Sequence, residues 1–166
     1  KRALSGNRIR YLLADEVGLG KTIEAGLIIK ELKERGMIKR ILIVCPKGLV
    51  TQWYVEMKDK FGEHFNIILP EDHDAIKRLH GVSNVYEVFD QIISPMDSIK
   101  PLERRAGWDR EKIERYNSER VYSIVNSGWD LIVIDEAHRV AGSSSDVARY
   151  KLARLLAKAS PYLLLL

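Results

Sequence analysis

The sequence predicts an α/β fold in which a mostly parallel sheet carries helices on both faces. Two features predict it. Short apolar runs of four or five residues alternate with longer segments in which apolar residues recur every three or four positions. The short runs are continuously apolar, which is typical of strands buried on both faces of a parallel sheet. A length of 166 residues suits a single domain, so we expect residues 1–166 to form one.

Six strands are expected. The runs 131–134 and 41–45 are the clearest, because every residue in them is apolar, and Pro46 ends the second. The stretch 71–88 is polar and mixed and receives no assignment. In chain order the expected strands are 11–14, 41–45, 65–69, 89–94, 131–134 and 162–166.

Four helices are expected between them. The clearest is 21–35, which Gly36 is expected to end. Its apolar residues at helical spacing should form the buried face: Ile23, Leu27, Ile28 and Leu32. The segment 110–125 interleaves basic and acidic residues and should be an exposed helix. In chain order the expected helices are 21–35, 49–61, 110–125 and 147–157.

Composition narrows the class of protein. Lys and Arg number 27 and Asp and Glu 23, so the surface is mixed and tilts only weakly towards an anionic partner. The single Cys45 excludes an internal disulfide and favours a reducing compartment, so we expect a cytoplasmic protein. No apolar run approaches the roughly 20 residues that span a bilayer, so no membrane association is expected. The chain begins without Met and ends on four leucines that read as an interrupted strand, which indicates a fragment of a longer protein.

A phosphate-binding loop is predicted directly after the first strand. A phosphate chain needs inward-pointing backbone N–H groups and a helix N-terminus behind them. Gly18 and Gly20 allow the close approach, Lys21 supplies charge to the β and γ phosphates of ATP, and Thr22 supplies a hydroxyl to Mg²⁺. The strict pattern has Gly where Asp15 stands. The alternative is an ordinary Gly-rich turn before a helix. The expected nucleotide-binding residues are Asp15, Glu16, Val17, Gly18, Leu19, Gly20, Lys21 and Thr22.

Two carboxylates follow the run 131–134. Asp135 at a buried strand tip can hold Mg²⁺ through its water shell, and Glu136 can orient or deprotonate the attacking water. The alternative is a strand that ends in a polar turn. Because Lys21 also follows a strand tip, we expect the two tips to lie side by side and to form one ATP-hydrolysing site.

The order of these motifs resembles the Swi/Snf-type ATPases of the superfamily-two helicase group, in particular the bacterial and archaeal branch with the RNA-polymerase-associated remodeller. Asp replaces the first Gly of the loop in that family. The matching blocks are 12–25 (motif I), 41–46 with Gln52 and Trp53 (motif Ia), 93–98, 135–138 (the DEAH box, motif II) and 162–166, the strand before motif III.

The resemblance implies the first RecA-like lobe of a motor that moves along double-stranded DNA. It implies a catalytic set of Lys21, Asp135, Glu136 and His138, with His138 coupling the γ-phosphate state to motif III. Lys47, Gly48 and Ser94 would contact DNA phosphates, although ordinary surface turns would look the same. The implied partners are a second RecA-like lobe of the same polypeptide and a protein moved along DNA, and a prokaryotic protein would be nucleoid-associated. The adenine-reading Gln motif should precede residue 1, and motif III and the second lobe should follow residue 166.

Two other functions remain open. A P-loop NTPase acting on protein, small molecules or single-stranded RNA would show no response of turnover to duplex DNA. A scaffold lobe would bind nucleotide, or DNA, without turnover. Trp53 is expected to be a core or lobe-packing residue rather than a base-stacking one.

Overall fold

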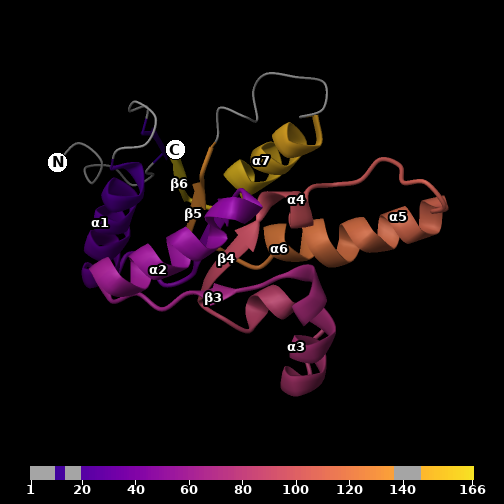
Figure 1. Ribbon diagram of the computed structural model, residues 1–166, viewed down its shortest axis with the longest axis horizontal. Coiled ribbons are helices and arrows are strands. Elements are labelled where there is room, and N and C mark those ends of the chain that lie inside the picture. Colours follow the sequence, from indigo (N-terminus) through magenta and orange to yellow (C-terminus); the bar gives the residue numbers. More distant parts are fainter. Residues whose placement is uncertain (1–9, 14–19, 137–146) are drawn as a thin grey trace.

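The computed structural model describes residues 10–13, 20–136 and 147–166 (Figure 1). Its strands form one six-stranded sheet in the order β1-β6-β5-β2-β4-β3, and every pair of neighbours is parallel. The predicted parallel α/β fold is therefore confirmed. The strands are β1 (Arg10–Leu12), β2 (Ile41–Cys45), β3 (Asn66–Ile67), β4 (Gln91–Pro95), β5 (Leu131–Ile134) and β6 (Tyr162–Leu165).

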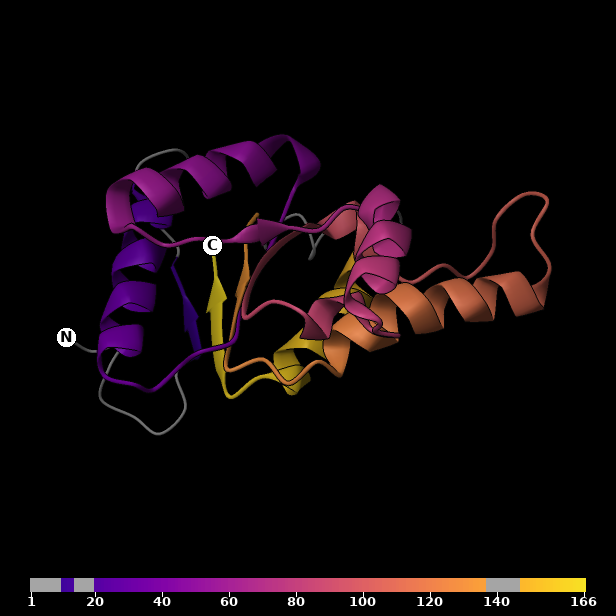
Figure 2. The same cartoon turned by 90° about the horizontal axis from the view of Figure 1, so that it is seen from below.

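Helices cover both faces of this sheet, as expected (Figures 1 and 2). One face packs against α1 and α2, and the other packs against α4, α6 and α7 with the segment around α3. The helices are α1 (Lys21–Glu34), α2 (Val50–Phe61), α3 (His73–His80), α4 (Met96–Ile99), α5 (Arg110–Tyr116), α6 (Ser123–Val125) and α7 (Val147–Ala159). Among the residues described, no helix is long and apolar enough to cross a membrane.

The central strand β2 shows how the two layers form. All five of its residues are buried. Ile41, Ile43 and Cys45 point into the layer beneath α1 and α2, whereas Leu42 and Val44 point into the opposite layer. Successive side chains of a strand leave on opposite faces, so a continuously apolar run supplies both cores at once.

Local patterns predicted most element limits to within two residues, but they missed the helix α4 and the features described next. The strand β3 has only two residues, and the unassigned stretch 71–88 contains α3. The predicted buried face of α1 is wrong in part, because Leu27 is 58% exposed. That face instead centres on Ala25, Gly26, Ile29 and Leu32.

Gly26 explains the rotation of α1. A Cβ at this position would lie 2.2 Å from the ring of Phe61, so the absence of a side chain lets α1 approach α2 closely. The end of α1 was predicted correctly. Gly36 has φ 67°, and its N–H donates to the carbonyl of Lys33 at 2.9 Å, while the N–H of Met37 donates to that of Leu32.

The predicted helix 110–125 is present, but its middle is wound more loosely. The π-helical turn η5 (Asn117–Tyr122) joins α5 to α6, and the Ser123 hydroxyl donates to the carbonyl of Ser118 at 3.0 Å. The α5 end extends away from the sheet (Figures 1 and 2). Its charges pair along the helix, with Arg110 on Glu114 and Arg115 on Glu111, as expected for an exposed helix.

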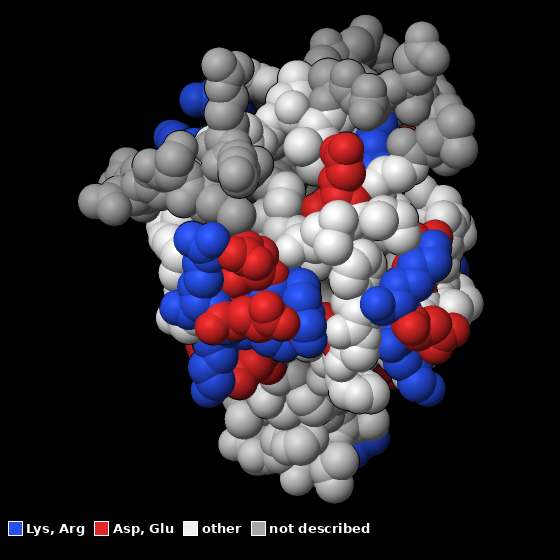
Figure 3. Space-filling view, turned by 90° about the vertical axis from the view of Figure 1, so that its left-hand side faces the viewer, with Lys and Arg blue, Asp and Glu red and all other residues white. Residues whose placement is uncertain are grey.

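The surface of α1 and α2 carries both signs of charge (Figure 3). Lys33 pairs with Glu63, whose side chain is 6% exposed, and Arg35 pairs with Glu31. The Nζ of Lys60 lies 3.5 Å from Oε2 of Glu56. The face therefore presents paired charges rather than a basic patch for an anionic partner.

A buried histidine makes the stability of the domain depend on pH. The Nε2 of His73 lies 3.3 Å from the hydroxyl of Tyr86, and both side chains are buried. Burial, with Arg120 and Lys77 nearby, lowers the pKa of His73 to about 4. In the unfolded chain the pKa returns to about 6.5, so between these values the unfolded state binds more protons. The stabilisation that neutral His73 contributes is fully present above pH 6.5 and is lost as the pH falls towards 4.

We expect the free energy of unfolding to drop by about 1–2 kcal/mol between pH 7.5 and pH 5, after allowance for solvent screening. Urea midpoints of this domain at the two pH values measure it. His73→Asn should flatten the dependence, whereas His64→Asn, at an exposed position, should not. An equal pH dependence in the His73 variant would refute the assignment.

Candidate nucleotide-binding site

The site begins at the N-terminus of α1, on the carboxyl edge of the sheet. Gly20 precedes the helix with φ 96°, a left-handed conformation that side chains disfavour, and its carbonyl accepts the N–H of Glu24 at 2.8 Å. Lys21 and Thr22 are the first two helical residues and are partly buried. A fourteen-residue helix that starts with a lysine offers backbone N–H groups and a cation to an anion. The predicted loop residues Asp15, Glu16, Val17, Gly18 and Leu19 lie outside the described residues.

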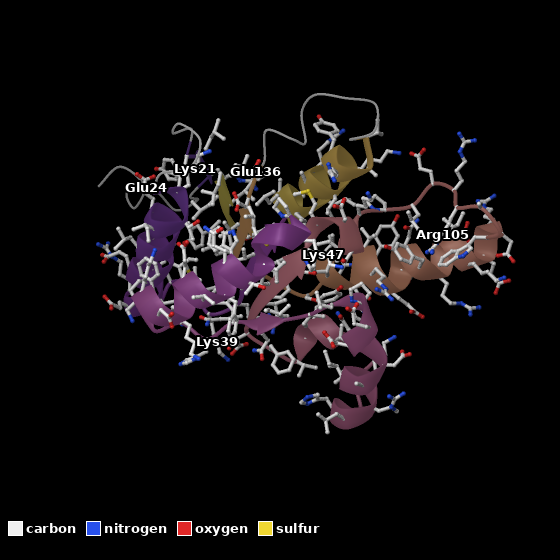
Figure 4. All side chains as sticks on the ribbon, in the orientation of Figure 1. Lys21, Glu24, Lys39, Lys47, Arg105 and Glu136 are labelled. Carbon is white, nitrogen blue, oxygen red and sulfur yellow. The ribbon has the colours of Figure 1, made fainter. Side chains whose placement is uncertain are left out.

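The two strand tips are not neighbours, which corrects the expected arrangement. β6 lies between β1 and β5, and Leu165 pairs with Leu12 on one side and Ile134 on the other. The strands end level, so the tips are two strand spacings apart, or about 10 Å. Figure 4 shows Lys21 and Glu136 at the same end of the molecule.

The carboxylate of Asp135 is held by two donors. The indole Nε1 of Trp53 donates to Oδ2 at 2.7 Å, and the backbone N–H of Glu136 donates to Oδ1 at 2.8 Å. The backbone N–H of Asp135 continues the sheet by donating to the carbonyl of Val44. Each carboxylate oxygen can accept a further hydrogen bond. The group is therefore oriented and can still bind the water shell of a cation.

The hydrogen bond from Trp53 was not predicted. The side chain is 1% exposed and packs in the core beneath α1 and α2, as expected of a packing residue. A buried indole N–H requires an acceptor, and this requirement is the only signal in the sequence for such a hydrogen bond. The acceptor lies 82 residues away, and no local pattern identifies it.

Glu136 adopts an uncommon backbone conformation. Its φ of 56° is the only positive value at a non-glycine position among the residues described. Such strain clusters at functional sites. Glu136 lines a cavity of about 100 Å³ together with Pro46, Met96, Asp97 and Arg149, and that volume has room for a few water molecules.

An ion pair forms one wall of this cavity. Arg149 donates to both carboxylate oxygens of Asp97, at 2.9 and 3.2 Å. Burial raises the pKa of Asp97, but hydrogen bonds from Arg149 and Lys100 outweigh it and hold the pKa below its ordinary value. Both signs of charge therefore face the cavity beside Glu136. His138, the remaining predicted catalytic residue, lies outside the described part of the chain.

The thiol nearest to this site is unreactive. Cys45 at the end of β2 is fully buried. Burial raises its pKa to about 12, with a smaller contribution from the negative charge of Asp135. The thiolate is therefore not formed at neutral pH.

The residues predicted to contact DNA separate into two groups. Lys47 and Gly48 are exposed in the short helix η2 (Lys47–Leu49), which follows β2 at the carboxyl edge of the sheet. Ser94 is wholly buried, so the prediction that its hydroxyl faces DNA is wrong. The reason is the length of β4, which continues to Pro95 and pairs Ser94 with Val44 inside the sheet.

The donor set fits a hydrated magnesium ion beside a polyphosphate. Thr22 offers a hydroxyl and Asp135 a carboxylate, and Mg²⁺ prefers such oxygen ligands while keeping several waters. Lys21 and the N-terminus of α1 suit the phosphates. The residues present can thus hold a magnesium nucleotide across the tips of β1, β6 and β5.

Comparison with known proteins gives consistent matches. The family model described as the SNF2-related domain matches residues 3–161. The chain is 37% identical over 158 residues to the RNA polymerase-associated protein RapA of Photobacterium profundum, covering 95% of this chain and 14% of that protein. The RapA protein of Yersinia enterocolitica is 38% identical, with coverage of 95% and 15%. The chain therefore spans about 15% of the length of these relatives.

Solved structures agree on the fold. The Sulfolobus solfataricus SWI2/SNF2 ATPase core in complex with dsDNA superposes with a TM-score of 0.64 at 24% identity, covering 93% of this chain and 26% of that chain. The SWI2/SNF2 ATPase core domain from the same organism gives a TM-score of 0.60 at 19% identity, with the same coverage. The likeness confirms the predicted RecA-like α/β architecture.

Proposed function

Because the chain belongs to the SNF2-related domain family, we propose that it is the ATP-binding and hydrolysing lobe of a double-stranded DNA translocase. One observation carries the proposal. Lys21 at the start of α1 and the pair Asp135 and Glu136 after β5 lie on the same sheet edge, where β6 separates β1 from β5. This spacing suits a triphosphate between them.

Each residue has a separate task in the proposed reaction. The ammonium of Lys21 and the N–H groups at the start of α1 bind the phosphate oxygens. Thr22 and Asp135 would hold Mg²⁺, Asp135 through water, and the ion would supply positive charge to the phosphates. Glu136 orients the attacking water and accepts its proton.

The relatives support a proposal for the wider assembly. A solved relative is an ATPase core in complex with dsDNA, and the exposed Lys47 and Gly48 lie on the same sheet edge as the site. The full-length protein supplies a second RecA-like lobe in the same polypeptide. A DNA-bound protein is the candidate object of the motion, since the curated relatives are RNA polymerase-associated. The proposed location is the cytoplasm, on the nucleoid in a prokaryote.

The test is ATP turnover by the full-length protein, titrated separately with duplex DNA, single-stranded DNA and RNA at one fixed salt concentration. We expect duplex DNA to raise the turnover rate most. Salt must be fixed because each phosphate contact releases counterions. Stimulation by RNA or protein alone would favour a different P-loop NTPase, and nucleotide binding without turnover would favour a scaffold lobe.

A variant at Lys47 tests the proposed DNA contact in the same titration. Lys47→Ala should raise the duplex concentration needed for half-maximal stimulation and lower the salt slope of DNA affinity by about 0.9. Turnover without DNA should be unchanged. Lys39→Ala is the matched control, because Lys39 is also exposed but lies just before β2, on the opposite edge of the sheet (Figure 4).

A further inference from the structure

Trp53 occupies a position that joins a helix to a catalytic strand tip. It lies in the first turn of α2 and shares the buried face of that helix with Val50 and Met57. Its indole N–H reaches across to Oδ2 of Asp135 at 2.7 Å. The bond therefore links the helical layer directly to the carboxylate proposed to hold the metal.

The geometry restricts Asp135 to one orientation. A carboxylate on a short side chain can rotate unless both oxygens are engaged. Oδ1 accepts the N–H of Glu136, which belongs to the same turn, and Oδ2 accepts the indole of Trp53, which belongs to another layer. Hydrogen bonds to an ionised acceptor are stronger than neutral ones. Loss of the indole N–H would leave one side of the carboxylate without a fixed donor.

We propose that Trp53 is a positioning residue for Asp135, which it orients towards the water shell of Mg²⁺. The inference rests on the proposed function, because it deepens the role of Asp135 at the same site. Residues that orient metal ligands from outside the coordination sphere typically change metal affinity or activity by about 10–100-fold when they are replaced.

Trp129 offers a matched comparison. It is 2% exposed and belongs to the core on the opposite face of the sheet. Its indole N–H donates to the backbone carbonyl of Ile124 at 2.6 Å. Trp129→Phe thus removes one buried indole hydrogen bond, as Trp53→Phe does, without altering a donor to Asp135.

The experiment measures ADP binding to the full-length protein by calorimetry as Mg²⁺ is varied, with no turnover involved. In Trp53→Phe, the Mg²⁺ concentration for half-maximal ADP binding should rise by about 10–100-fold. ADP affinity in EDTA should stay at the wild-type value. The Trp129→Phe variant should match the wild type in the Mg²⁺ dependence of ADP binding and in its ADP affinity in EDTA. Equal Mg²⁺ dependence in wild type and Trp53→Phe, or equal losses in the two variants, would overturn the inference.

Two further measurements separate positioning from packing. Trp53→benzothienylalanine replaces only the N–H by sulfur, so it tests the hydrogen bond even where Trp53→Phe fails to fold. In a double-mutant cycle with Asp135→Asn, Trp53→Phe should cause no further loss of Mg²⁺ affinity. Additive losses would contradict action through Asp135. Wild-type protein without Mg²⁺-dependent ADP binding would overturn the proposed function and this inference together, whereas a normal wild type with an unaffected Trp53 variant would overturn the inference alone.

Discussion

Lys21→Ala in the full-length protein is expected to lower kcat/KM for ATP by about 10²–10³-fold. The substitution removes the cation at the start of α1, where phosphate oxygens are proposed to bind. Backbone N–H groups remain, so part of the nucleotide affinity should survive. Steady-state turnover against ATP concentration measures the loss, and equilibrium binding of Mg·ATP separates affinity from chemistry.

Lys30→Ala is the matched control on the same helix. Lys30 lies nine residues further on, about 13 Å along the helix axis, and faces Glu34 and Glu63 at 3.9 Å. We expect its replacement to leave kcat/KM for ATP unchanged. Similar losses in both variants would mean that Lys21 acts only through helix stability.

Glu136→Gln is expected to lower kcat by about 10²–10⁴-fold while ATP binding is retained. The amide keeps the shape of the side chain but cannot accept the proton of the attacking water. ATP should therefore remain bound and uncleaved, which single-turnover kinetics with labelled ATP would detect. Turnover at the wild-type rate would refute the water-positioning role.

Glu24→Gln provides the comparison for this variant. Glu24 is exposed in the first turn of α1, near the same end of the molecule as Lys21 and Glu136 (Figure 4). The same chemical change there removes one nearby negative charge but no group aimed at the water. Its kcat should equal that of the wild type. A shared loss would indicate a general electrostatic effect.

Much of the fold follows from local sequence because its central strands are continuously apolar. β2 and β5 were expected at the limits that the structure shows. Strand order is a different matter, since the position of β6 between β1 and β5 depends on pairings between distant segments. The prediction that the two strand tips lie side by side was wrong for this reason.

Contacts between distant residues also account for the other differences. Leu27 was placed on the buried face of α1 from periodicity, but the close approach of Gly26 to Phe61 sets the rotation of that helix. Ser94 was placed at the surface, but β4 runs one residue further than its apolar pattern indicates. Within the candidate site, the positions of Lys21 at a helix start and of Asp135 after a strand were predictable from local sequence, whereas the partner of a side chain such as Trp53 was not.

The short helix η2 and the first turn of α2 are consecutive, so Lys47 and Trp53 belong to one continuous helical rod. No loop separates the exposed Lys47 and Gly48 from the indole that donates to Asp135. The exposed surface at η2 and the carboxylate of Asp135 are therefore joined through one short helical segment and one hydrogen bond.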